Sequence, residues 1–301
     1  MNTTILKASI RKELWEFNGM LKWVPIGLAG VFIFIPLLSL LLNGIEISGW
    51  LEGLRHLSES QDNGGLVKVF FVATSALFIP FVLVGFLVQL HYFVNCLYDE
   101  RRDLSVMFWR SLPVSDEVTI ISKLLTGAII IPAIFYSAAT VLFVMGLVLA
   151  FIGSVVLSIG FDISLWGVWS SAQIMSAIGS IWLTLLPVAI WLLPLYSWLM
   201  FTSIYAKKAP FLWAILPIVA LLIIEAIVVH YLQLSQPFFG HFISDYFSLT
   251  PEKLVSNPLE MSSSRWGLLK AVIAQIDFRT VIVSAGLLLA TYWVRVNKQE
   301  S

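Results

Sequence analysis

Few residues of this chain have the types and spacing that chemistry requires. The four histidines, His56, His91, His230 and His241, have no metal-ligand spacing, and neither H-E-x-x-H nor G-x-S-x-G occurs. No glycine directly precedes a lysine, which excludes the phosphate-binding loop G-x-x-x-x-G-K-[ST]. The lone cysteine, Cys96, excludes a disulfide within the chain and a multi-cysteine metal site. The sequence therefore predicts a chain that is not an enzyme and that holds no cofactor of its own.

Three polar residues lie within or near the ends of apolar runs: Glu225, Gln89 and His91. An ionisable group in a membrane helix marks a candidate functional site, so these residues form a candidate intramembrane polar site. The run that contains Glu225, residues 211–232, holds no lysine or arginine, however, and one acid without a basic span partner makes a poor proton or ion relay. We therefore favour the alternative that Glu225 is hydrated near the outer interface or accepts hydrogen bonds from a neighbouring helix.

The most distinctive segment is the charged stretch Asp99–Asp116, DERRDLSVMFWRSLPVSD, which lies between two of the longest apolar runs. Asp103 can cap a short helix that Pro113 ends, and Ser115 or Asp116 can cap the helix that follows. The sequence thus predicts one short helix between two caps.

This short helix carries residue types that are typical of binding interfaces. Aromatic and aliphatic anchors dominate such interfaces, and arginines add steering and hydrogen bonds. The residues of these two kinds are Phe108, Trp109, Leu112, Arg101, Arg102 and Arg110. We expect the helix to lie at the membrane surface and to bind a partner; the alternative is an interfacial helix that contacts only lipid head groups.

The composition sets the environment of these residues. Of 301 residues, 59% are apolar and 12% are charged, and the mean hydropathy is +0.91, whereas a soluble domain has roughly 25% charged residues. The formal net charge is zero, so no overall attraction to nucleic acid is expected. The sequence predicts an all-α polytopic membrane protein.

A membrane-spanning helix needs about 20 apolar residues. Six such runs occur: residues 23–42, 67–97, 118–160, 172–205, 211–232 and 276–294. The third is too long for one straight span, and we expect a single helix that is kinked or offset near Pro132. The fourth is interrupted by Pro187 and Pro194. Together the runs predict a single transmembrane domain over residues 1–301, without a soluble domain.

Residues 1–22 are predicted to form an amphipathic helix. Its apolar side chains recur every three or four residues and form one stripe: Leu6, Ile10, Leu14, Phe17 and Leu21. Basic residues elsewhere on the helix, together with Trp15, suit lipid head groups, so we expect it to lie flat on the membrane. The alternative, a helix packed on a soluble domain, would need a domain that this chain lacks.

The distribution of positive charge predicts the orientation. With six spans and a cytoplasmic N-terminus, the inner segments hold twelve of the 18 Lys and Arg residues, and the longer outer segments hold six. Positive residues are enriched on the cytoplasmic side of membrane proteins. We therefore expect both termini and the charged segment 99–116 in the cytoplasm.

This topology and the charged segment resemble the ABC-2-type permeases, the membrane subunits of ATP-binding-cassette transporters. The residues that carry the resemblance are Tyr98–Ser115, YDERRDLSVMFWRSLPVS, which are similar to the family's charged cluster followed by an "lfWrSLPvs" core. The resemblance covers nearly the whole chain in topology, but only this segment in residue pattern.

The resemblance implies that residues 99–116 contain a coupling helix that docks on a separate ATPase subunit. The docking residues would be Tyr98, Asp99, Glu100, Arg101, Arg102, Asp103, Phe108, Trp109, Arg110, Ser111, Leu112 and Pro113. The partner ATPase would bind ATP and Mg, and a second permease chain would complete a transporter in the bacterial inner membrane. We expect an exporter of an unidentified substrate.

Two other functional classes remain as alternatives. An ATP-independent secondary transporter or channel would require internal repeats and paired polar groups near the middle of the bilayer. A membrane scaffold would use the same surface helix only to recruit a soluble protein.

Overall fold

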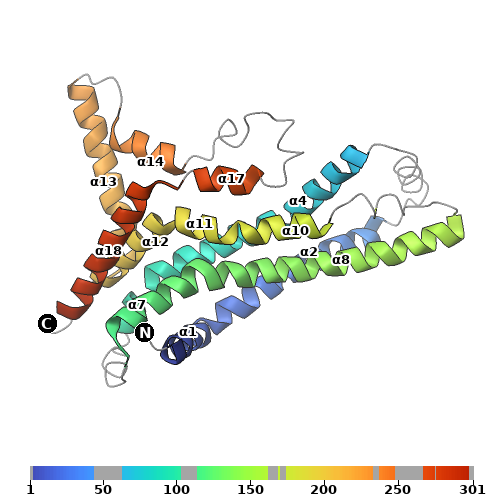
Figure 1. The fold of residues 1–301 in the computed structure, drawn as a ribbon, viewed down its shortest axis with the longest axis horizontal. Helices are drawn as coiled ribbons and strands as arrows, with labels where there is room; N and C mark the ends of the chain where they lie inside the picture. The colour runs from blue at the N-terminus through green and yellow to red at the C-terminus, as the bar shows by residue number, and fades with distance from the viewer. Residues whose placement is uncertain are drawn as a thin grey trace. The chain divides into compact units, whose positions relative to one another are not determined.

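The computed structural model describes residues 3–43, 63–102, 114–161, 169, 174–232, 237–247, 267–274 and 276–297. Within these residues every regular element is a helix (Figure 1). Five helices are long and apolar enough to cross a membrane, or six if a bent pair counts as one span. The predicted all-α polytopic membrane protein is confirmed at this level.

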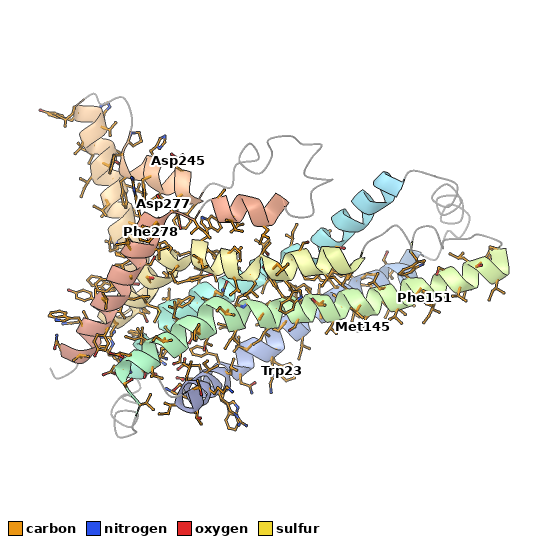
Figure 2. All side chains as sticks on the ribbon, viewed as in Figure 1. Trp23, Met145, Phe151, Asp245, Asp277 and Phe278 are labelled. Carbon is orange, nitrogen blue, oxygen red and sulfur yellow. The ribbon has the colours of Figure 1, made fainter. Side chains whose placement is uncertain are left out.

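The outer surfaces of the helices are apolar, as a membrane environment requires. Trp23, Met145 and Phe278 project away from their helices (Figure 2), and Trp23 and Phe278 are 73% and 75% exposed. Exposed apolar surface on this scale marks contact with a membrane or with another protein.

The described chain packs as two compact units, which are described separately below. Unit 1 comprises residues 1–16, 87–130 and 184–301, and unit 2 comprises residues 17–86 and 131–183. In chain order the helices are α1 (Thr3–Glu16), α2 (Asn18–Asn43), α4 (Asn63–Asn95), α5 (Tyr98–Arg102), α7 (Asp116–Leu125), the π-helix η1 (Thr126–Ile130), α8 (Ile131–Phe161), α10 (Ile174–Leu183), α11 (Leu185–Trp191), α12 (Leu193–Tyr205), α13 (Pro210–Tyr231), α14 (Phe239–Phe247), α17 (Gly267–Ala274) and α18 (Phe278–Asn297).

The predicted helix over residues 1–22 is not continuous. α1 ends at Glu16 and α2 begins at Asn18, so the first apolar helix starts five residues before the predicted boundary at Trp23. The break lies next to Asn18 and Gly19, both of which have low helix propensity. On α1 the Arg11 guanidinium lies 5.6 Å from the ring centroid of the exposed Trp15.

The third apolar run forms one helix, Asp116–Phe161, as predicted, and its irregularity lies just before Pro132. Ser115 caps this helix, because its hydroxyl accepts a hydrogen bond from the Val118 amide. A π-helix, η1, follows α7 and pairs each N–H with the carbonyl oxygen five residues earlier. The residue five positions after Gly127 is Pro132, which has no N–H to donate.

A side chain from α4 donates a hydrogen bond to the Gly127 carbonyl, for which Pro132 has no N–H. Gln89 is buried, and its Nε2 donates to the Gly127 carbonyl oxygen at 2.8 Å. Gly127 also admits the ring of Phe93, since a Cβ at this position would lie 2.3 Å from Phe93 Cζ. The π-helix, Gly127 and the Gln89 amide therefore together allow α4 and η1 to pack closely.

The fourth predicted run, 172–205, is not a straight span. It consists of α10, α11 and α12, with turns at Thr184 and Leu192 and a bend of 54° at the second turn. Pro187 and Pro194 follow these turns by three and two residues, and each removes an N–H and crowds the preceding turn. The bend ahead of Pro194 therefore divides the run into a bent pair, Ile178–Trp191 and Leu193–Tyr205.

The last two predicted spans correspond closely to α13 and α18. In unit 1, α12 packs along α18 and also contacts α13 (Figure 1). The short α14 is held by Tyr246, whose hydroxyl lies 2.8 Å from the Trp191 carbonyl oxygen and 3.2 Å from Thr280 Oγ1. Burial raises the pKa of the Tyr246 hydroxyl above its usual value, which keeps it protonated as a donor.

We expect Gly127→Ala to destabilise the protein, because the added methyl would collide with Phe93. Overpacking of this kind costs about 1–3 kcal/mol. The matched control is Gly146→Ala, where nothing lies within 4 Å of the added Cβ and helix propensity favours alanine by about 1 kcal/mol. Thermal unfolding of the purified protein should show a lower Tm only for Gly127→Ala; equal Tm values for the two variants would contradict the packing described for Phe93.

Candidate functional site

The structure describes both flanks of the predicted docking segment but not its middle. The N-terminal flank is α5, Tyr98–Arg102, and the C-terminal flank runs from Val114 into α7. The other predicted docking residues, Asp103, Phe108, Trp109, Arg110, Ser111, Leu112 and Pro113, lie outside the described residues. Their docking role stays a prediction, and the flanks can be examined directly.

The N-terminal flank is fastened to the end of α12. The buried Ser203 Oγ accepts hydrogen bonds from the amides of Leu97 and Tyr98, at 3.2 and 3.0 Å, and so caps the start of α5. Arg101 Nη2 donates to the carbonyl oxygens of Ser203 and Ala206, at 2.9 and 2.6 Å. These carbonyls lie at the end of α12, where positive side chains are favoured.

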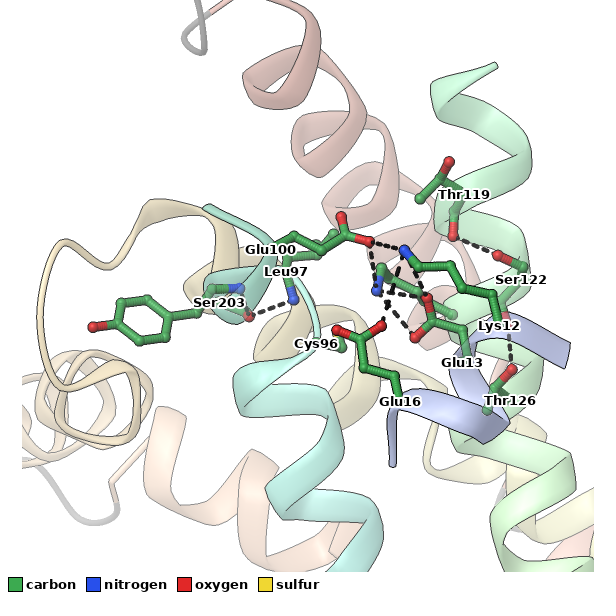
Figure 3. A network of polar contacts seen from close by, with 12 residues as sticks. Lys12, Glu13, Glu16, Cys96, Leu97, Glu100, Thr119, Ser122, Thr126 and Ser203 are labelled. Atoms are coloured by element: carbon green, nitrogen blue, oxygen red, sulfur yellow. Dashed lines mark hydrogen bonds and ion pairs between the residues drawn. The ribbon is translucent and has the colours of Figure 1, made fainter. Parts of the chain in front are cut away.

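The same flank carries the most heavily paired carboxylate in the described part of unit 1. Glu100 is 1% exposed and accepts from Lys12 Nζ at 2.9 Å (Figure 3). It also accepts from Arg295 Nη1 at 3.2 Å, and Lys123 Nζ lies 3.1 Å away. These cations come from α1, α18 and α7. Glu100 therefore holds α5 against three other helices.

The ion pairs continue on both sides of Glu100. Lys123 Nζ donates to both carboxylate oxygens of Glu13, at 2.9 and 3.0 Å, and the Tyr92 hydroxyl donates to Glu13 at 2.9 Å. On the other side, Arg295 Nε donates to Asp116 Oδ1 at 2.6 Å. We call Lys12, Glu13, Glu100, Asp116, Lys123 and Arg295 the ion network.

The ion network is electrically balanced, with three carboxylates and three cations. Lys123, Glu13 and Arg295 are 0%, 2% and 4% exposed at their side chains. A buried charge is tolerated when it is paired and hydrogen-bonded, and removing one partner leaves the other uncompensated. Glu16 lies at the edge of the network, where burial raises the pKa of its carboxyl and the charge of Lys123 acts in the opposite direction.

The ion network changes the expectation for several residues. Glu100 and Arg101 are engaged inside the chain, so these two side chains hold the segment rather than present themselves to a partner. The sequence predicts Lys12 and Glu13 on the polar side of an amphipathic helix at the membrane surface, and Glu13 is instead buried. The reason is that Lys123 and Tyr92 together satisfy its carboxylate.

All four segments that were predicted to share one side of the membrane meet in unit 1. α1 and the start of α7 meet α5 at Glu100, and α18 joins them through Arg295 near its C-terminal end. The α12–α13 connection, residues 206–209, joins through Arg101. The contacts bring these segments together within unit 1, and the side of the membrane on which they lie stays a prediction.

The three candidate polar residues are not brought together. Glu225 accepts hydrogen bonds from the amides of Phe239 and Gly240, the latter at 2.7 Å, and so caps α14. Gln89 serves the Gly127 carbonyl, and the exposed His91 neighbours Asn95 on α4. Acceptance of hydrogen bonds from a neighbouring helix is one of the two roles that the sequence left open for Glu225.

The sequence contained one clue to the ion network. Lys123 lies inside an apolar helix, where a lysine requires a carboxylate partner. Neither the spacing nor the periodicity identifies that partner, because Glu13 and Glu100 are 110 and 23 residues away along the chain. Only the packing of α1, α5, α7 and α18 selects it.

Lys123→Met is expected to destabilise the protein strongly, because Glu13 and Glu100 would each lose a buried cation. Breaking a buried pair in this way costs about 3–5 kcal/mol. Lys207→Met, at an exposed position, is the matched control. The double variant Lys123→Met/Glu13→Gln should recover part of the loss in Tm. A Lys123→Met protein as stable as the Lys207→Met protein would refute the pairing.

Glu225→Ala should release the start of α14, because two backbone amides lose their acceptor. Loss of a helix cap costs about 0.5–2 kcal/mol. Hydrogen exchange read by mass spectrometry should show faster exchange in the peptide that contains Phe239 and Gly240. Asp245→Ala, a change on the exposed side of the same helix, should leave those amides protected; equal exchange in both variants would show that Glu225 is not the cap.

No protein-family model matches the chain, and no curated protein or solved structure shows significant similarity to it. The resemblance to the ABC-2-type permeases therefore rests on the residues Tyr98–Ser115 and on the predicted topology.

Proposed function

We propose that the chain is the permease subunit of an ATP-binding-cassette transporter that exports an unidentified substrate. A separate ATPase subunit supplies ATP hydrolysis with its own ATP and Mg, and a second permease chain completes the assembly. The observation that carries the proposal is the charged, aromatic segment 103–113, whose N-terminal flank is fastened by a buried ion pair and whose C-terminal flank is fastened by a partly buried one.

Fixed flanks are what a coupling segment needs. A docking helix passes a partner's movement into the membrane only if its ends are attached to the spanning helices rather than to flexible linkers. Here α5 is attached to α12 by Ser203 and Arg101, and Glu100 attaches it to α7 and α18. A partner that moved segment 103–113 would therefore act on three apolar helices at once.

The convergence of the inner segments supports the proposed orientation. The N-terminal helix, the two flanks of the 99–116 segment, the 206–209 connection and the end of α18 meet in one place, as a common side requires. The enrichment of Lys and Arg in these segments assigns that side to the cytoplasm. The proposed location is the bacterial inner membrane with both termini inside, where a cytoplasmic ATPase could reach the segment.

No specific observation favours the other two classes. A secondary transporter would place paired polar groups near mid-bilayer, whereas in the described residues Glu225 and Gln89 both serve backbone groups. Arg295, which pairs with Glu100, lies two residues from the end of α18 and not near the middle of that helix. The scaffold alternative uses the same segment and differs only in lacking an ATPase partner.

The test uses the purified full-length chain and candidate ATPase subunits. Trp109→Ala and Arg110→Glu should each weaken complex formation and lower substrate-stimulated ATP hydrolysis, because they remove the central anchors of the interface. Truncating such an anchor typically costs about 2 kcal/mol or more of binding free energy. Arg279→Glu, an equal charge reversal at the exposed start of α18, is the control and should leave both unchanged. If both segment variants bind and couple normally, the docking assignment is wrong.

A further inference from the structure

One guanidinium contacts both flanks of segment 103–113. Arg295 Nη1 donates to Glu100 at 3.2 Å, and Arg295 Nε donates to Asp116 at 2.6 Å. Glu100 lies three residues before the segment and Asp116 three residues after it. The Arg295 side chain therefore links the residues on the two sides of segment 103–113 through two hydrogen-bonded ion pairs.

The two flanks depend on Arg295 to different degrees. Glu100 is also bound by Lys12 and Lys123, so its flank stays attached without Arg295. Within the described residues the ion pair of Asp116 is with Arg295, and Asp116 is 26% exposed at its side chain. Lys123, farther along α7, still pairs with Glu100 when Arg295 is lost. Loss of the bridge should therefore free mainly the first turn of α7 around Asp116.

The bridge requires the shape of arginine as well as its charge. Guanidinium presents five N–H donors in a fixed plane, and here two of its nitrogens reach different carboxylates. Lysine presents a single ammonium centre on a flexible stem and does not reproduce this fork. Arg295→Lys thus keeps the charge balance of the ion network while removing the geometry that joins the flanks.

Arg295 belongs to α18, which packs along α12 and contacts α7. We propose that Arg295 is a positioning residue, which fixes the separation of the two flanks and passes a change in that separation to α18. Holding the ends of a chain segment together restricts the conformations that the segment can adopt. The transmission part of this inference rests on the proposed function, whereas the bridge itself does not.

The bridge can be tested on the full-length protein without any partner. Spin labels attached after Arg102→Cys and Glu117→Cys, in a Cys96→Ser background, report the separation of the flanks from two exposed positions. The parent should give one narrow distance distribution, and Arg295→Lys should broaden it. Arg279→Lys, the same exchange at the exposed start of α18, should not. An unchanged distribution in Arg295→Lys overturns the proposal.

The transmission part needs the ATPase partner and a transport assay in vesicles. Arg295→Lys should retain complex formation and ATP hydrolysis but move less substrate per ATP hydrolysed. If Arg295 has a purely structural role, Arg295→Lys should lower complex formation and ATP hydrolysis together, and this result would overturn the assignment. An unchanged amount of substrate moved per ATP hydrolysed would also overturn it. If the flanks respond to Arg295→Lys but no ATPase binds, the bridge stands and the proposed function fails. If an ATPase binds and the flanks do not respond, the proposed function stands and the bridge fails.

Discussion

The carboxylate of Glu100 is the point at which the ends of four helices are joined. Its oxygens are approached by Lys12, Lys123 and Arg295, each from a different helix, and it is itself almost completely buried. A charge in this position is stable only because the surrounding cations are held at hydrogen-bonding distance. The dependence is mutual, since the buried Lys123 and Arg295 need that carboxylate as much as it needs them. The ion network therefore fixes how α1, α5, α7 and α18 pack, because its charges are paired only when these helices come together in one arrangement.

The apolar helices around this constraint are irregular where local chemistry requires it. Pro132 has no N–H to donate to the Gly127 carbonyl, and the side-chain amide of Gln89 on α4 donates to that carbonyl. Backbone polar groups at membrane depth must be satisfied within the protein, so such a side-chain donor is expected wherever a proline interrupts a helix. Pro194 has a larger effect, since the chain bends by 54° just ahead of it.

These contacts determine which polar residues could still serve a substrate or a partner. Gln89 and Glu225, which in isolation suggest a polar pathway, each serve backbone groups of the protein itself. The charges of the network are likewise internal, and among the flanking residues the exposed Arg102 faces outward. What remains for a partner is the charged and aromatic segment whose flanks are fixed, and fixed ends suit a segment that transmits movement more than one that merely tethers.

The sequence by itself determined the class, the number of apolar runs, a helix cap at Ser115 or Asp116, the irregularity near Pro132 and the interruptions at Pro187 and Pro194. These follow from local rules, because hydropathy, capping and the missing proline N–H act over a few neighbouring residues. Only the tertiary structure decided that Glu13 is buried and that Glu100 and Arg101 are engaged inside the chain. Ion pairs between residues as distant as Glu100 and Arg295 leave no periodic pattern along the chain. Their formation depends on how helices from separate parts of the sequence pack, which is a property of the whole fold.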